Sequence, residues 1–404
     1  MLNFRKNPVL VSFLLMFAVG AIFSTGIIVG LLIPSYSIKN TVLAKDDERS
    51  ELLASFYQAW DIIHDQYLVQ PIDDKMLVQG AIRGMMESLE DPYSAYMNPE
   101  EYRTQNTPLQ GEYTGIGAWV DTTGEFLVIT SPMPDSPAEK AGILPGDRVI
   151  SIDGKDMSGL DPIVVLDYIL GPEGTIVKIG IERGSRAEFF EFEIERAIIQ
   201  VPSVESQVLE GNIGYIRLYT FGSNSTEEFR SALVGLIDQN ITGLIFDLRN
   251  NTGGYVDTAV DITSLLMERN TVLIEEWADG SRDTYESKQK PIAPDIPLVV
   301  LINEGSASAS EITAGALQDN GRAILVGTRS YGKGYIQNWI PLVDDNGAIR
   351  ITIARWLTPN GRQIQDYGLS PDVVIEFDQP FADIEDDIQI KKAIDLLTNE
   401  SSPD

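Results

Sequence analysis

Cysteine is absent from this 404-residue sequence, and histidine occurs once. Without cysteine the chain has no disulfide framework and no thiol chemistry, which is compatible with an oxidising compartment. The single histidine, His64, lies far in sequence from every glycine-rich segment, so we expect a surface or packing role for it. A general base must lie within hydrogen-bonding reach of its nucleophile, and zinc needs a cluster of ligands. The sequence therefore argues against a Ser-His-Asp triad and against a zinc site.

Positive charge is also scarce. The chain has 30 Lys and Arg residues against 60 Asp and Glu residues, which gives a formal net charge of −30. Such a charge repels phosphate backbones and anionic headgroups, so nucleic acid is not an expected partner. The hydrophobic content of 43% and the charged content of 22% are those of a globular chain. At this length we predict two or three domains.

The amino-terminal part differs from the rest of the chain. Residues 9–33 carry no charge and form a stretch longer than a signal-peptide core, long enough for the roughly 20 residues of a membrane span. Arg5 and Lys6 precede this stretch, so the positive-inside rule places the amino terminus in the cytoplasm and exports the chain beyond residue 34. We expect residues 1–45 to hold a cytoplasmic start, a single-pass plasma-membrane anchor and a linker. The alternative is a signal peptide cleaved near residues 42–44.

Patterns of apolar residues divide the remaining chain into four segments. Residues 46–110 have apolar residues at spacings of three and four and predict a helical module. Residues 111–196 have short β-rich runs between Gly, Pro and Asp turns, which indicates a small separate domain. Residues 197–380 alternate apolar runs with helical stretches, as in an α/β core, and residues 381–404 predict an acidic helix and tail. The apolar faces of the terminal helices could pair in a homodimer, although packing within one chain is the simpler explanation.

A serine lies at a predicted strand-to-helix turn. Residues 298–302 are a candidate buried strand, residues 312–317 are an apolar helix, and Ser308 lies between them. Such a turn exposes a hydroxyl beside the free amides of a helix amino terminus, where an oxyanion could form. The alternative is that Ser308 caps the helix, because Glu311 completes a capping box. The segment alone favours the cap.

A lysine between two glycines is the second candidate. Gly332 and Gly334 flank Lys333 at the entrance to a β-like run. Burial lowers the pKa of a lysine, which would let neutral Lys333 accept the proton of Ser308. On a regular strand Gln337 would share a face with Lys333 and could orient it. The alternative is a solvated surface lysine beside a turn.

A diglycine is the third candidate. Gly253 and Gly254 follow the candidate strand at residues 244–246, and their bare backbone can approach a substrate carbonyl. The Gly254 N–H is therefore a candidate oxyanion donor. An ordinary turn explains the diglycine equally well when it is considered alone.

Together these segments resemble the active-site signature of the carboxy-terminal processing, or tail-specific, serine peptidases. The resemblance lies in residues 305–311, 331–334 and 337, and it extends through residues 91–94, 249–254, 358–362 and 368–372. It implies that Ser308 is the nucleophile, Lys333 the general base and Gln337 its orienting partner. It also implies an oxyanion hole formed by the amides of Ala309 and Gly254, with Gly253 as the other candidate. No metal or organic cofactor is needed.

The same resemblance implies a crotonase-like ββα peptidase core with an inserted PDZ domain. Residues 113–118 resemble the carboxylate-binding loop of PDZ domains, which makes Gly115, Ile116 and Gly117 the predicted peptide-binding residues. Residues 136–147 resemble the next helix and turn of that domain. A bound peptide would add a strand to the domain while a side pocket accepts its last residue. The alternative is a hairpin with structural glycines.

One position departs from the family pattern. Some relatives carry an arginine in the segment that resembles residues 169–171, and this arginine is proposed to couple peptide capture to the active site. This chain has Leu170 there, and Arg148 is one candidate substitute.

By this resemblance we expect a serine endopeptidase that cuts exported or membrane proteins near their carboxyl termini after the PDZ domain captures the tail. The expected partners are proteins with accessible apolar carboxyl termini, and the membrane through the amino-terminal helix. The alternative is a non-catalytic, membrane-tethered PDZ adaptor that binds carboxy-terminal peptides. The joint presence of Ser308, Lys333 and Gln337 argues against the adaptor.

Overall fold

The computed structural model describes residues 46–184, 188–288, 290–376 and 384–399. The membrane span predicted at residues 9–33 lies outside these ranges and stays a prediction. Among the helices that are described, none is both long and apolar enough to cross a membrane. The chain divides into two compact units, residues 1–74 and 75–404.

Helix α2 (Asp46–Gln66) represents the first unit. Its predicted apolar stripe is exposed, with 75% of Leu52 and 41% of Phe56 accessible to solvent, as is 58% of Tyr67, which directly follows the helix. His64 has the expected surface packing role, because its ring stacks on Trp60 at 5.1 Å. Among the described residues of this unit, 46–74, no element covers this helix face, and its pairing in a dimer stays a prediction.

The second unit begins with α3 (Asp74–Glu87), β1 (Ala95–Met97) and α4 (Pro99–Gln110). A capping box starts α4, because Asn98 Oδ1 accepts the Glu101 N–H at 2.8 Å and Glu101 Oε2 accepts the Asn98 N–H at 2.8 Å. Strand β1 pairs antiparallel with β18 (Ala348–Leu357) of the core. The module predicted as helical therefore contributes a strand to the sheet beside the site, which its apolar spacing did not indicate.

A compact β domain comes next, entered and left through a two-stranded ribbon of β2 (Glu112–Gly115) and β9 (Ala197–Gln200). Its sheet has the order β3-β4-β5-β7-β8, with β6 paired to β5. These strands are β3 (Ala118–Asp121), β4 (Leu127–Pro132), β5 (Arg148–Ile152), β6 (Lys155–Asp156), β7 (Ile176–Arg183) and β8 (Glu188–Glu195), and the helices are α5 (Pro137–Ala141) and α6 (Pro162–Ile169). Buried aliphatic side chains such as Leu127, Val149 and Ile179 give the domain its own core.

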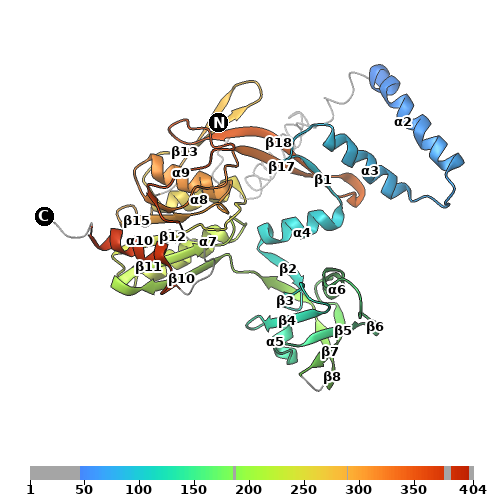
Figure 1. The fold of residues 1–404 in the computed structure, drawn as a ribbon, viewed down its shortest axis with the longest axis horizontal. Helices are drawn as coiled ribbons and strands as arrows, with labels where there is room; N and C mark the ends of the chain where they lie inside the picture. The colour runs from blue at the N-terminus through green and yellow to red at the C-terminus, as the bar shows by residue number, and fades with distance from the viewer. Residues whose placement is uncertain (1–45, 185–187, 289, 377–383, 400–404) are drawn as a thin grey trace, which may run out of the picture. The chain divides into compact units, whose positions relative to one another are not determined.

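The α/β core is built on a six-stranded sheet of order β10-β11-β12-β15-β16-β19, antiparallel at β10 and parallel elsewhere (Figure 1). Its strands are β10 (Val204–Leu209), β11 (Ile213–Leu218), β12 (Gly243–Asp247), β15 (Leu298–Ile302), β16 (Ile324–Gly327) and β19 (Val373–Val374). Helices α7 (Ser225–Ile237), α8 (Val256–Leu266) and α9 (Ala309–Asp319) cover one face, and α10 (Ile388–Asn399) covers the other. Both faces are covered, which explains the nearly continuous apolar strands.

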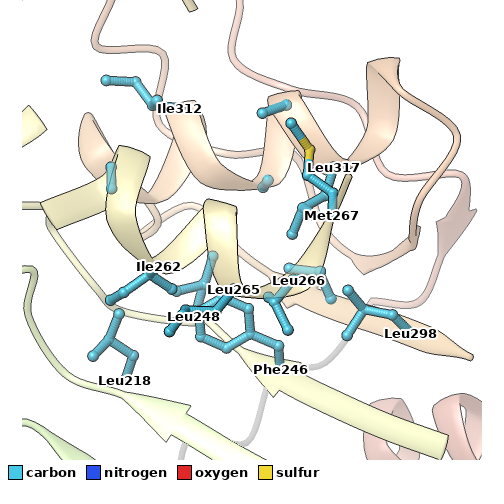
Figure 2. Close-up of a cluster of buried hydrophobic side chains, with 14 of the residues drawn as sticks. Leu218, Phe246, Leu248, Ile262, Leu265, Leu266, Met267, Leu298, Ile312 and Leu317 are labelled. Atoms are coloured by element: carbon cyan, nitrogen blue, oxygen red, sulfur yellow. The ribbon is translucent and has the colours of Figure 1, made fainter. Parts of the chain in front are cut away.

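Alternation along the strands assigns side chains to the two faces. Figure 2 shows Leu218, Phe246 and Leu248 facing Ile262 and Leu265 of α8. The intervening side chains of the same strands pack against α10, whose inward residues are Ile390, Ala393 and Leu397. The apolar face of the carboxy-terminal helix is therefore buried within the chain. This agrees with the simpler explanation from the sequence, packing within one chain.

A second sheet lies beside this core. It contains β13 (Thr271–Trp277), β14 (Arg282–Glu286) and β17 (Tyr335–Pro341), joined by the long strand β18. One edge of β18 pairs with β17, and the other pairs with β1 and β13. Because β17 leads directly out of the Lys333 segment, this sheet determines where that lysine lies.

Candidate active site

A cavity of about 350 Å³ brings the predicted site residues together. Its lining includes Gly254 after β12, Ser308 between β15 and α9, Lys333 before β17 and Gln337 within β17. Ala309 is the first residue of α9 and is fully buried beside Ser308. The carboxyl ends of parallel strands are the usual ligand-binding edge of an open α/β sheet, and Gly254 and Ser308 follow two such ends.

Ser308 has a strained backbone, with φ 55° and ψ −116°. A non-glycine residue in this region costs about 1–3 kcal/mol and persists only where its surroundings enforce it. Residues that cap helices usually have extended dihedral angles, so capping does not account for the strain. Strained strand-to-helix turns of this kind expose a nucleophilic hydroxyl.

Neighbouring hydroxyls hold the Ser308 turn in place. Ser306 Oγ donates to Leu248 O at 2.7 Å, and Ser310 Oγ donates to Asn251 O at 2.7 Å. Both side chains are buried, so the two serines that flank Ser308 are fixed to the chain segment after β12. Of the three alternating serines in this segment, Ser306 and Ser310 therefore stabilise the turn, and Ser308 lines the cavity.

The diglycine packs directly against this turn. A Cβ on Gly253, whose φ is 105°, would lie 2.8 Å from Ala307 O and 2.9 Å from Ala309 N. Gly253 N–H donates to Asn251 Oδ1 at 2.9 Å and is therefore occupied. In the part of the chain that the structure describes, the N–H groups of Gly254 and Ala309 have no hydrogen-bond acceptor. Of the two glycines, Gly254 is the one with a free amide.

Glu311 links the serine turn to the lysine loop. Its Oε2 accepts the backbone N–H groups of Ser308 and Lys333, both at 2.9 Å. Its Oε1 accepts Ser330 Oγ–H at 2.6 Å and Gly332 N–H at 2.7 Å. The carboxyl is fully buried, and this burial raises the pKa of Glu311, while the four hydrogen bonds act in the opposite direction. The capping box in the sequence indicated one of these four contacts.

Lys333 is half-buried within the cavity wall. Burial lowers the pKa of Lys333, the positive charge of Arg350 lowers it further, and Glu311 opposes both. The ammonium nitrogen lies 6.0 Å from the centre of the Tyr93 ring. Among the described residues no hydrogen bond joins Lys333 Nζ to Ser308 Oγ. Catalytic hydrogen bonds are often long in a free enzyme and shorten when substrate binds.

The sequence argument placed Gln337 beside Lys333 because both would share one face of a regular strand. This reason is wrong, although Gln337 does line the same cavity as Lys333. Strand β17 begins at Tyr335, after Lys333, and its register shifts between Ile336 and Gln337. Strand alternation therefore does not connect Lys333 with Gln337, yet both line the cavity. The Gln337 Nε2 atom is buried without a hydrogen-bond partner in the described chain, which leaves it free to act on a neighbour in the cavity.

The predicted peptide-binding loop lies in the β domain. Gly115 ends β2, Ile116 is buried, and Gly117 has a φ of 76°. Burial raises the pKa of Tyr113, and the nearby backbone of Ala118 and Gly117 opposes this rise. The hydroxyl of Tyr113 therefore lies near Gly117, one of the three residues predicted to bind a peptide carboxylate.

Leu170 and Arg148 are both engaged inside this domain. The Leu170 side chain would come within 3.2 Å of a Cβ on Gly115, so it packs against the start of the loop. Arg148 pairs with Glu182 at 2.5 Å and lies over the Phe126 ring at 5.4 Å. The candidate substitute for the missing arginine is thus held by partners within its own domain.

Comparison with family models gives three matches. Residues 212–375 match the model of peptidase family S41, and residues 128–183 match a PDZ domain. Residues 33–101 match the model of the activating protease CtpB N-terminal domain. The first match contains Ser308, Lys333 and Gln337.

Whole-chain comparison agrees with these matches. The carboxy-terminal-processing protease of Bartonella bacilliformis is 38% identical over 331 residues, which are 80% of this chain and 75% of that protein. Carboxy-terminal processing protease CtpB of Bacillus subtilis is 36% identical over 335 residues, 82% of this chain and 69% of that protein. The solved photosystem II D1 C-terminal processing protease is 32% identical, covers 81% of this chain and 89% of its own, and has a TM-score of 0.47. This chain therefore belongs to the carboxy-terminal processing serine peptidases of family S41 and carries a PDZ domain.

Proposed function

We propose that this peptidase works through a catalytic dyad of Ser308 and Lys333. One observation carries the proposal: a serine in a strained turn and a lysine with a burial-lowered pKa line the same cavity. A lysine with a lowered pKa has a larger neutral fraction near neutral pH, and neutral lysine is the form that accepts a proton.

Each step uses a group in this cavity. Neutral Lys333 accepts the proton of Ser308 while Oγ attacks the scissile carbonyl carbon. The free amides of Gly254 and Ala309 stabilise the oxyanion. Protonated Lys333 then donates to the leaving amine, which leaves an acyl-enzyme. Water, deprotonated by Lys333, hydrolyses the ester and restores the serine. Gln337 orients the lysine between these steps.

The substrates are proteins with accessible, apolar carboxyl termini. Captured tails add a strand to the PDZ domain at Gly115, Ile116 and Gly117, and the scissile segment enters the cavity. Val256, Ile312 and Trp356 contribute apolar surface to the cavity, which suits an apolar side chain near the cut. The amino-terminal span anchors the protein in the plasma membrane with the catalytic part outside, so exported and membrane proteins are the accessible substrates.

The test compares detergent-purified full-length protein with its Ser308→Ala and Lys333→Met variants on an unfolded protein with an apolar tail. Both variants should lose cleavage by at least about a thousandfold, the scale of removing a member of a catalytic constellation. Lys288→Met is the control, because Lys288 pairs with Asp257 and Asp261 at the surface. Persistent cleavage in the Ser308 and Lys333 variants would reject the dyad. Peptide binding without turnover by the parent protein would favour the adaptor instead.

A further inference from the structure

A segment that precedes β1 lies against the lysine loop from the far end of the sequence. The ring centre of Tyr93 is 6.0 Å from Lys333 Nζ and 5.8 Å from the ring centre of Tyr335. Tyr93 belongs to the stretch that matches the CtpB N-terminal domain model, outside the peptidase match. The surroundings of the lysine therefore include a side chain from outside the peptidase core.

Two hydrogen bonds connect the Tyr93 hydroxyl to the loop. Gln365 Nε2 donates to Tyr93 Oη at 2.9 Å, and Gln365 Oε1 accepts the Gly334 N–H at 2.9 Å. A Cβ on Gly334 would lie 2.6 Å from Gln365 N, so the loop is packed on the Gln365 backbone without a gap. Gly334 directly follows Lys333, so a shift of Gln365 moves the lysine.

Tyr93 is itself fixed by the core sheet. Its carbonyl accepts Arg350 Nε–H at 2.9 Å, and its N–H donates to Asp91 Oδ1 at 3.0 Å. Two residues later Ala95 pairs with Arg350 in the β1–β18 ladder. These bonds give the tyrosine a defined position from which its hydroxyl can hold Gln365.

We propose that Tyr93 is a positioning residue for Lys333, acting through Gln365 on Gly334. The inference rests on the proposed role of Lys333 as the base. In this proposal the Tyr93 ring, 6.0 Å from Lys333 Nζ, keeps one side of the lysine apolar, and the hydroxyl fixes the loop.

The charged groups that act on Lys333 come from two elements. Arg350 of β18 lowers its pKa and Glu311 of α9 raises it, while burial is the largest cause of the lowering. The rings of Tyr93 and Tyr335 also lie nearby. Removing the Tyr93 ring admits water, which moves the pKa of Lys333 up toward its ordinary value. Loss of the ring face acts in the opposite direction, but at 6.0 Å from the ring centre this contribution is the smaller one, so the net shift should be upward. The activity that depends on neutral lysine then appears at higher pH.

Tyr93→Phe tests the hydrogen-bonded connection from Tyr93 through Gln365 to Gly334, because it keeps the ring and removes the hydroxyl. Tyr96→Phe is the matched control: Tyr96 lies on β1, is buried, and donates its hydroxyl to Asn346 O at 2.8 Å. Each variant loses one hydrogen-bonded hydroxyl, so their unfolding temperatures should fall equally. In the full-length enzyme, Tyr93→Phe should lower kcat about fivefold at constant KM, the factor of one hydrogen bond, and Tyr96→Phe should not. Gln365→Met should match Tyr93→Phe, and the double variant should add nothing further.

A second readout does not need turnover. The pH dependence of Lys333 acylation by acetic anhydride, followed by peptide mass spectrometry, reports the neutral fraction of that lysine. Tyr93→Leu should move its midpoint to higher pH, whereas Tyr96→Phe should leave it in place. Equal kcat in both phenylalanine variants, with an unchanged Lys333 midpoint in Tyr93→Leu, would overturn the proposal. Absence of Ser308-dependent cleavage in the parent would instead reject the dyad, and the acylation profile would still report on Tyr93.

Discussion

Glu311 accepts the backbone N–H of Lys333 at 2.9 Å across a separation of 22 residues in sequence. The same oxygen accepts the N–H of Ser308 at 2.9 Å, so one buried carboxylate fixes both halves of the proposed dyad. The contacts are to backbone rather than to the reacting side chains. Glu311 therefore holds the two segments together through their backbones, and its contacts do not involve the serine hydroxyl or the lysine amine.

Glu311→Gln should damage both stability and activity. An amide has one acceptor oxygen, so its NH₂ group must face two of the four donors that now bind the carboxylate. Losing hydrogen bonds to a charged group costs roughly 3 kcal/mol of unfolding free energy. The displaced loops should lower kcat/KM by about a hundredfold. Urea unfolding and peptide cleavage measure the two effects.

Glu304→Gln provides the control for this substitution. Glu304 belongs to the same turn but is exposed, and its Oε2 accepts Thr328 Oγ1–H at 3.0 Å. Its change should leave kcat/KM within about twofold, because an exposed contact contributes little. Equal losses of kcat/KM in the two variants would mean that the turn tolerates neither change, and this result would reject the positioning role of Glu311.

The pH dependence of cleavage should report Lys333. Its pKa is lowered by burial and by Arg350, so the rising limb of kcat/KM against pH should lie below the titration of an ordinary lysine. Arg350→Met removes a positive charge, raises the pKa of Lys333 and moves this limb to higher pH. Arg350→Lys keeps the charge and should keep the limb near its original position. A limb that moves equally in both variants would show that geometry, rather than charge, is responsible.

Local sequence patterns predicted the Ser308 turn because all of its signals lie close together in the sequence. The apolar run of β15, the capping box with Glu311 and the apolar helix α9 each depend on neighbouring residues. The bulge before Gln337 and the approach of Tyr93 have no such local signal. They depend on which strands pair with β18, and this pairing joins Ala95 to Arg350, which are 255 residues apart in sequence.

The two terminal helices show a related limit. Both α2 and α10 have apolar residues at helical spacing, and this spacing correctly predicts helices. In α10 the apolar residues are buried against the sheet, whereas Leu52 and Phe56 of α2 are exposed. Periodicity defines an apolar face, but the partner of that face depends on the tertiary arrangement.

Tyr113→Phe should strengthen binding of carboxy-terminal peptides to the PDZ domain. The Tyr113 hydroxyl lies near the backbone of Gly117 and Ala118, at the end of the loop that is predicted to bind a peptide carboxylate. In the parent protein the hydroxyl would compete with the peptide carboxylate for this loop. Without the hydroxyl the affinity for the peptide should rise about fivefold, the factor of one hydrogen bond. Fluorescence anisotropy with an apolar peptide measures the change, and the same peptide with an amidated end should not gain. Unchanged affinity for the free acid would place the carboxylate elsewhere.

Lys333→Met should abolish cleavage yet stabilise the fold at neutral pH. Because burial lowers the pKa of Lys333, the folded protein bears the cost of a partly desolvated cation wherever the lysine is charged. That cost is fully present below the folded pKa and disappears as the pH rises past the unfolded value of about 10.4. The variant should therefore melt above the parent at pH 7, and the difference should shrink as the pH rises toward about 10. Lys288→Met, at an exposed ion pair, should show no such gain. A Lys333→Met protein that melts below the parent at pH 7 would contradict the view that this lysine is held for reactivity at the expense of stability.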